Sequence, residues 1–112
     1  MAFEKICTLD DVWEGDMAGF ESEDGTELLI VYPNGGELKA FQNICPHQNF
    51  ELSDGTFEDN VLTCRAHLWQ FDGRTGKGIN PADCALAEYP VKIDGDDVYV
   101  DVVGVEALHS HT

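Results

Sequence analysis

The sequence predicts an all-β domain, in which an antiparallel β-sandwich forms a base and a smaller subdomain is inserted into it. Two observations favour this fold class: β-prone runs alternate with turns rich in Gly, Asn and Asp, and the apolar pattern is that of strands rather than helices. The chain has 112 residues, which suits one domain with a modest core. We therefore expect one domain over residues 1–112, with the inserted subdomain at 45–83 and the base at 1–44 and 84–112.

The base is expected to contain two hairpins. In the first, residues 27–32 and 37–43 are joined by Pro33-Asn34-Gly35-Gly36, which carries the Asn-Gly turn signal. In the second, residues 89–93 and 98–102 flank an Asp-Gly turn, and valines recur at every second position of the later run. This alternation is typical of a half-buried strand.

The segments outside these hairpins are shorter. Four of them are expected to be strands: residues 3–7, 17–21, 61–64 and 68–71. Residues 9–13 are expected to form a single helical turn. Turn signals at 53–55 and 72–76 alternate with the short strands in the middle of the chain, a pattern typical of loops held on a small scaffold.

Two ligand pairs stand in this middle segment. Cys45-Pro46-His47 and Cys64-Arg65-Ala66-His67 are separated by residues 48–63, and each pair supplies one thiolate and one imidazole. In a Rieske [2Fe–2S] centre two Cys hold one iron and two His hold the other. The spacing therefore predicts one such cluster, with Cys45, His47, Cys64 and His67 as its ligands.

The ligand types also indicate a function. With two neutral imidazoles in place of two thiolates, the oxidised cluster is formally neutral, so an added electron costs less than in an all-Cys cluster. His-ligated clusters accordingly lie at about −150 to +300 mV, against about −400 mV for plant-type ferredoxins. The motif predicts a one-electron carrier of moderate potential.

A structural zinc site is the alternative from another class. Two Cys and two His can close a tetrahedral Zn²⁺ site, which would make the chain a zinc-stapled interaction module. Zinc modules usually group their ligands as Cys-x₂₋₄-Cys and His-x₃₋₅-His, however, and a Cys-x-His pair departs from that spacing. The spacing favours the iron–sulfur cluster.

Length and charge limit the function further. Besides the ligand pairs the chain has only His109 and His111, so it lacks the residues for a second, catalytic iron site. We expect an electron carrier rather than an enzyme. The formal net charge of −16 argues against nucleic acid or anionic membrane as a partner and favours transient docking on basic protein surfaces. The acidic excess also has a simpler explanation in solubility.

The sequence contains no export signal and no run of about 20 apolar residues that would span a membrane, which predicts a cytoplasmic protein. In that reducing compartment Cys7 and Cys84 are expected to be reduced, buried thiols rather than a disulfide.

Longer strings around the ligands resemble one family. They are Cys64-Arg65-Ala66-His67-Leu68-Trp69, Phe71-Asp72-Gly73-Arg74-Thr75-Gly76, Gly78-Ile79-Asn80-Pro81 and Leu86-Ala87-Glu88-Tyr89-Pro90-Val91. The chain resembles the Rieske ferredoxin component of the bacterial toluene monooxygenases. The resemblance implies a carrier that takes electrons from an NADH-dependent flavin and iron–sulfur reductase and passes them to a diiron hydroxylase of aromatic hydrocarbons. We expect this carrier to be a monomer. The resemblance also implies that Cys45 and Cys64 hold the buried iron and that His47 and His67 hold the outer one.

Two related roles stay open beside this one. The same carrier could serve a ring-hydroxylating dioxygenase, since the ligand motif does not encode the docking surface. A small subunit of a nitrite reductase shares the fold, but such subunits often lack the ligands that this chain keeps.

Residues around the ligands bear on the cluster's potential and contacts. Respiratory Rieske proteins carry an extra Cys in each ligand loop and hydroxyl side chains near the sulfurs, whereas this chain has Pro46, Ala66, Trp69 and Phe71 at those places. Fewer hydrogen bonds to sulfur predict a potential toward the low end of the range. The candidates for shielding the cluster or docking a partner are Trp69, Pro81, Gln48 and Arg65. For Trp69 the simpler role is packing, for Pro81 an ordinary turn and for Arg65 neutralisation of nearby acids.

Overall fold

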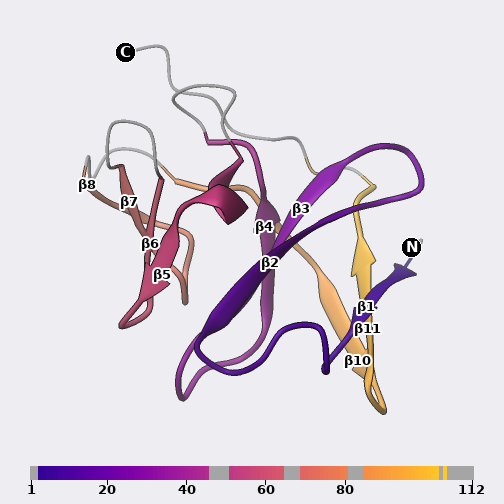
Figure 1. The fold of residues 1–112 in the computed structure, drawn as a ribbon. Coiled ribbons are helices and arrows are strands. Elements are labelled where there is room, and N and C mark those ends of the chain that lie inside the picture. Colours follow the sequence, from indigo (N-terminus) through magenta and orange to yellow (C-terminus); the bar gives the residue numbers. More distant parts are fainter. Residues whose placement is uncertain (1–2, 46–50, 65–68, 81–84, 104, 106–112) are drawn as a thin grey trace.

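The computed structural model describes residues 3–45, 51–64, 69–80, 85–103 and 105, and it is an all-β structure as predicted (Figure 1). The described part contains eleven strands and one short 3₁₀ turn. They are β1 (Phe3–Thr8), β2 (Asp16–Glu21), β3 (Glu27–Tyr32), β4 (Lys39–Gln42), η1 (Leu52–Asp54), β5 (Thr56–Glu58), β6 (Val61–Thr63), β7 (Gln70–Asp72), β8 (Gly78–Asn80), β9 (Glu88–Tyr89), β10 (Val91–Asp94) and β11 (Asp97–Asp101). No helix in this part of the chain is long and apolar enough to cross a membrane.

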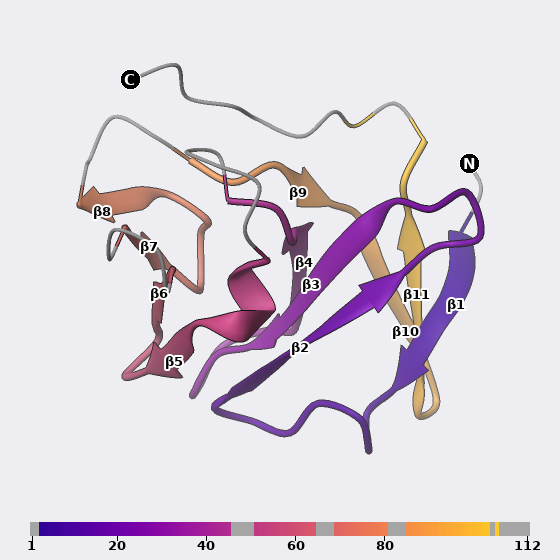
Figure 2. The ribbon, with the colours of Figure 1, turned by 45° about the horizontal axis from the view of Figure 1, so that its top comes forward.

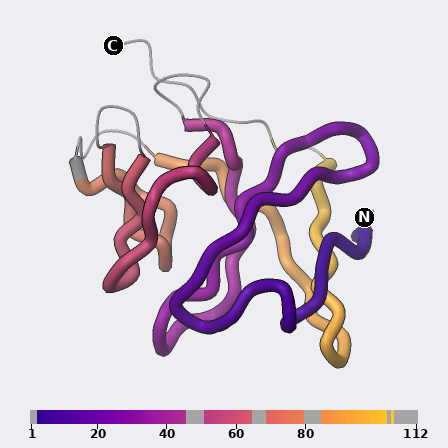
Figure 3. The backbone as a smooth tube through the Cα atoms, viewed as in Figure 1, coloured from indigo at the N-terminus to yellow at the C-terminus, as the bar shows by residue number. Residues whose placement is uncertain are grey.

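The strands form three antiparallel sheets, with the orders β1-β11-β10, β2-β3-β4-β9 and β5-β6-β7-β8. The sheet of β2, β3, β4 and β9 lies between the other two, as both ribbon views show (Figure 2). The chain leaves this central sheet after β4, builds β5 to β8, and returns at β9 beside β4 (Figure 3). The β5–β8 sheet is thus inserted in the chain between β4 and β9, two paired strands of the base.

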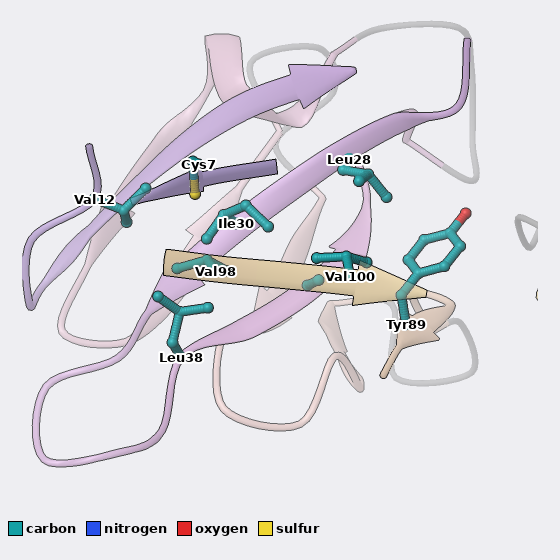
Figure 4. Close-up of a cluster of buried hydrophobic side chains, with 9 residues drawn as sticks. Cys7, Val12, Leu28, Ile30, Leu38, Tyr89, Val98 and Val100 are labelled. Carbon is teal, nitrogen blue, oxygen red and sulfur yellow. The ribbon is translucent and has the colours of Figure 1, made fainter. Parts of the chain in front are cut away.

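β3, in the middle of the central sheet, is buried on both faces. Leu28 and Ile30 point into one apolar cluster, while Leu29 and Val31 point into another, and all four side chains are fully buried. The first cluster joins the central sheet to Cys7, Val98 and Val100 of the outer sheet (Figure 4). The second joins it to the β5–β8 sheet. The continuous apolar run Leu28–Val31 therefore reflects a strand with two covered faces rather than a half-exposed one.

Both predicted hairpins of the base are present. In the first, the Gly36 N–H donates a hydrogen bond to the Pro33 carbonyl at 3.1 Å, and Gly35 has φ 72°. In the second, β10 and β11 are joined by a turn in which Gly95 has φ 64°. One prediction needs correction, because the expected strand at 89–93 is divided at Pro90. Its first part pairs with β4 and its second with β11. Proline has no N–H to continue a ladder, so the chain changes sheets there.

The helical turn expected at residues 9–13 is wrong. The segment contains a β-turn instead, in which the Asp11 N–H donates to the Thr8 carbonyl at 3.0 Å. The Asp11 carboxylate also accepts a hydrogen bond from the Thr8 N–H at 2.9 Å, so a side chain stabilises the same turn. Val12 then enters the first apolar cluster, where it is fully buried, so core packing sets the course of this segment.

The middle of the chain holds more strand than the sequence predicted. β6 and β7 lie where short strands were expected, and η1 covers part of the turn expected at 53–55, but β5 and β8 are additional. β5 and β6 are joined by Asp59 and Asn60, whose positive φ values of 50° and 63° are those of a type I′ hairpin turn. The Asn60 side chain also binds the Asn34 backbone, which fastens this hairpin to the first turn of the base.

Candidate metal centre

Two of the four predicted ligands lie in the described part of the chain, and the fold brings them into one apolar cluster. Cys45 follows β4 by three residues, and Cys64 directly follows β6, so the two thiols come from different sheets. Both are almost completely buried, with exposed fractions of 1% and 0%. The buried side chains that share their cluster are Leu29, Val31, Phe41, Leu52, Leu62, Phe71 and Leu86.

The first ligand loop is held closed at its base. Ile44 and Glu51 form a β-bridge on either side of residues 46–50, and the Leu52 N–H donates to the Asn43 carbonyl at 2.6 Å. The buried Asn43 side chain adds two bonds to Ser53, accepting its N–H at 2.9 Å and donating to its Oγ at 3.2 Å. These bonds therefore fix the backbone on which Cys45 leaves the central sheet.

The second ligand loop is the connection of the β6–β7 hairpin. The Cys64 N–H donates to the Trp69 carbonyl at 2.8 Å, one step beyond the Thr63–Gln70 strand pair. Leu62 and Phe71, which face each other on the two strands, are fully buried in the cluster that holds the cysteines. Their burial sets the register of the hairpin and with it the position of Cys64.

A third connection, residues 81–84, joins β8 to Ala85. Lys77 and Ala85 form a β-bridge, and the Leu86 N–H donates to the Gly76 carbonyl at 2.8 Å. Gly76 has φ 78°, and a Cβ there would lie 2.7 Å from the Phe41 ring, so this position requires glycine. The bases of all three connections thus meet around one apolar cluster.

An acidic cleft borders the first loop. It has a volume of about 310 Å³ and is lined by Gly19, Phe20, Glu21, Glu27, Asn43, Glu51 and Ser53. The pKa of Glu27 is raised, mainly because its carboxyl group shares a hydrogen bond with that of Glu51, with burial and the charges of Glu51 and Glu21 adding to the effect. Three glutamates, Glu21, Glu27 and Glu51, therefore line the cleft on this side of the site.

Several predicted residues lie outside the described part of the chain: His47, Gln48, Arg65, His67, Pro81, Cys84, His109 and His111. Among the described residues no three His, Cys, Asp or Glu side chains form a metal site by themselves. Trp69 is described, and its half-buried side chain packs against the cluster that contains the cysteines.

Cys7 is separate from this site. It is a free, buried thiol in the first apolar cluster, as predicted from the sequence. Burial, together with the nearby Asp11 carboxylate, raises the pKa of Cys7 from 9.0 to about 11. A thiol with that pKa stays protonated at neutral pH and is poorly suited to bind a metal.

The described donors fit an iron–sulfur cluster. Two thiols from two sheets, enclosed by aliphatic and aromatic side chains, form a soft and water-poor donor pair of the kind that Fe–S clusters and zinc take. An apolar shell makes net charge costly, which favours a centre that is neutral in one of its states. Gln42 and Asn43 were missed from the sequence, although two amide side chains, three and two residues before Cys45 and following the apolar Ala40-Phe41, were the available signal.

Comparison with known proteins identifies the class. The family model of the Rieske [2Fe-2S] domain matches residues 2–90, and the chain therefore belongs to the Rieske [2Fe–2S] family. It carries one Rieske-type [2Fe–2S] cluster, which decides against the structural zinc interpretation of the same ligands.

The relatives specify the kind of Rieske protein. The chain is 40% identical over 104 residues to the ferredoxin component of the alkene monooxygenase system of Xanthobacter autotrophicus, covering 92% of this chain and 81% of that one. It is 43% identical over 105 residues to the ferredoxin component of biphenyl 2,3-dioxygenase of Rhodococcus jostii, covering 93% and 96%. The ferredoxin of carbazole 1,9a-dioxygenase from Nocardioides aromaticivorans has a similar structure, with a TM-score of 0.77, 28% identity and coverage of 89% and 97%. The chain is an electron-transfer ferredoxin of multicomponent oxygenase systems and not a catalytic subunit.

Proposed function

We propose that this ferredoxin transfers single electrons from an NADH-dependent flavin and iron–sulfur reductase to a diiron hydroxylase that hydroxylates aromatic hydrocarbons. It would act as a cytoplasmic monomer and bind each partner transiently. The similarity to the alkene monooxygenase ferredoxin supports a monooxygenase partner. The net charge of −16 supports docking on basic surfaces, at rates that fall as salt rises.

In this proposal Cys45 and Cys64 hold one iron, and His47 and His67 hold the other. The observation that carries it is the meeting of Cys45 and Cys64, each at the closed base of its loop, in one buried cluster. When bound, the cluster supplies reversible one-electron chemistry at moderate potential. The aliphatic and aromatic wall excludes water from the thiolates, and the hydrogen bonds at the loop bases hold their positions.

We also propose that residues 45–83 act as the cluster-binding subdomain of one domain over residues 1–112. The β5–β8 sheet, which lies within that range, supports this division. Within the subdomain Trp69 is proposed to shield the iron–sulfur cluster, since its side chain packs against the apolar cluster that contains Cys45 and Cys64. Gln48, Arg65 and Pro81 are proposed to contribute to shielding or docking.

The ligand assignment is tested by electron paramagnetic resonance on anaerobically purified protein, before and after dithionite, with iron and sulfide measured on the same sample. The parent should give a signal only on reduction, with the low average g value of a His-ligated cluster. Cys64→Ser should lose that signal, whereas Cys7→Ala, which alters a buried thiol in the other core cluster, should keep it. A Cys64→Ser protein with a normal signal would refute the assignment.

The second candidate function is electron transfer to a ring-hydroxylating dioxygenase. The ferredoxin component of biphenyl 2,3-dioxygenase supports it, because the two chains are 43% identical over almost the whole length of that ferredoxin. The two candidates separate in reconstitution with NADH and reductase, using a diiron aromatic monooxygenase hydroxylase or a biphenyl dioxygenase oxygenase as acceptor. Turnover should be faster with the hydroxylase and should slow with added salt. Preference for the dioxygenase would replace the first candidate by the second.

A further inference from the structure

Gln42 is a buried polar residue at the end of β4, three residues before Cys45. Its side chain is 1% exposed, and it makes hydrogen bonds to two described backbone groups. Its Oε1 accepts the Ala87 N–H at 2.8 Å, and its Nε2 donates to the Ile44 carbonyl at 2.7 Å. The Gln42 backbone N–H also donates to the Ala87 carbonyl at 3.0 Å. Both ends of this carboxamide therefore bind the backbone.

The bond to Ile44 acts directly on Cys45. The Ile44 carbonyl belongs to the peptide group that joins Ile44 to Cys45, and a trans peptide is planar with its C=O and N–H pointing in opposite directions. A donor that fixes the carbonyl also fixes the direction of the Cys45 N–H. Gln42 thus sets the orientation of the backbone at the point where the chain reaches Cys45.

The bond to Ala87 connects the same side chain to another part of the site. Ala87 follows Leu86, whose side chain lies in the cluster with Cys45 and whose N–H binds the Gly76 carbonyl at the base of the third connection. One buried carboxamide therefore links the start of the first ligand loop to the segment that follows residues 81–84. An apolar side chain of similar volume would fill this space but could make neither bond.

We propose that Gln42 is a positioning residue that tunes the reduction potential of the cluster by orienting the Ile44–Cys45 peptide. This inference rests on the proposed role of Cys45 as an iron ligand. The potentials of iron–sulfur clusters depend on the amide N–H groups around their sulfurs, because such donors stabilise the reduced, more negative state. Release of the Ile44–Cys45 peptide removes a fixed donor direction, so the potential falls.

The test compares Gln42→Met with the control Val98→Ala. Val98 is fully buried in the first apolar cluster, which contains neither proposed cysteine ligand, so Val98→Ala lowers stability without touching the Ile44–Cys45 peptide. Each protein is analysed for iron, sulfide, thermal stability, midpoint potential and the g values of the reduced cluster. Both variants should lose stability. Only Gln42→Met should show a lower potential and displaced g values while it retains iron and sulfide.

Equal potentials and g values in Gln42→Met and the parent would overturn the inference, and so would equal shifts in both variants, which would indicate general loosening. Gln42→Asn, whose carboxamide is one methylene too short to reach both partners, should shift the potential in the same direction if Gln42→Met does not hold a cluster. Loss of the iron–sulfur cluster from both Gln42 variants, with the cluster of Val98→Ala intact, would leave Gln42 a purely structural role and overturn the tuning. A parent without the reduced Rieske signal would refute the proposed function itself.

Discussion

Gly55 offers the sharpest steric test of how the site is built. It lies between η1 and β5, where a Cβ would be 2.0 Å from the Thr63 carbonyl oxygen and 3.2 Å from the Leu52 carbonyl oxygen. Cβ atoms essentially never approach another heavy atom within 3.0 Å, so Gly55→Ala requires a backbone shift of about 1 Å. Thr63 is the residue before Cys64, and the shift therefore reaches a proposed ligand.

The expected cost follows from the nature of the contact. Overpacking typically costs about 1–3 kcal/mol, and the upper part of that range applies here because a backbone carbonyl cannot rotate away as a side chain can. The same displacement disturbs the Thr56–Thr63 strand pair. We expect Gly55→Ala to lose about 3 kcal/mol of unfolding free energy. With a urea slope of about 1.5 kcal/mol/M, the midpoint falls by about 2 M.

The assay is urea unfolding of the anaerobic holoprotein, followed by circular dichroism, together with iron and sulfide per chain. Gly36→Ala is the control, because its Cβ would meet only side-chain atoms, at 3.2 Å from Pro33 and 3.8 Å from Arg74. That variant should stay within about 0.5 M of the parent midpoint. A Gly55→Ala protein that behaves like Gly36→Ala and keeps full iron would refute the steric reasoning.

Three further outcomes are expected. Phe71→Ala removes a fully buried ring from the cysteine-containing cluster and should cost about 3–5 kcal/mol in urea unfolding, with lower iron content, whereas Phe71→Leu should lose less. Asn60→Ala should lower the free energy of unfolding by about 2 kcal/mol, because it breaks the hydrogen bonds to the Asn34 backbone and places alanine at φ 63°. Asn60→Gly should lower it by about half as much, since glycine adopts a positive φ without strain. The third concerns pH. The folded state holds the Cys7 proton more tightly, with a pKa of about 11 against 9.0, so this stabilisation is complete below about pH 9 and is lost as pH rises toward 11. The free energy of unfolding of the parent should fall by about 2 kcal/mol more over that interval than that of Cys7→Ala, and parallel pH profiles would contradict the assignment.

The elements that could be predicted are those with a local signal. The run Leu28–Val31 and the alternating valines of β11 indicated strands, and Asn34-Gly35 and Gly95 marked hairpin turns that the structure contains. The strands β5 and β8 each contain one apolar residue among three, so no β-prone run marks them, whereas β6 and β7 overlap the β-prone runs at 61–64 and 68–71. The division at Pro90 depends on which sheet each half meets, and local sequence does not contain that information.

The candidate site shows the same limit. The spacing of cysteines and histidines indicated the chemistry, because ligand types and short separations are local properties. The hydrogen bond between Gln42 and Ala87 joins residues 45 positions apart, and the Asn60–Asn34 contact spans 26. Such contacts follow from the packing of whole sheets, and a single sequence does not encode them in any pattern that periodicity or turn rules can detect.

Only one of the two apolar clusters contains the proposed cysteine ligands, so loss of iron should destabilise the two sides of the central sheet to different degrees. The first lies between the central sheet and the sheet of β1, β11 and β10, and both proposed cysteine ligands lie in the other. Under the proposed ligation Cys45 belongs to the chain leaving the central sheet and Cys64 to the β6–β7 hairpin, so the cluster cross-links the central sheet to the β5–β8 sheet. Metal binding stabilises the parts that it joins, and it stabilises other parts only as far as they unfold together with them. Removal of iron should therefore expose amides of β5–β8 to hydrogen exchange while β1, β10 and β11 stay protected, and equal loss of protection in all three sheets would show that the two clusters fold as one unit.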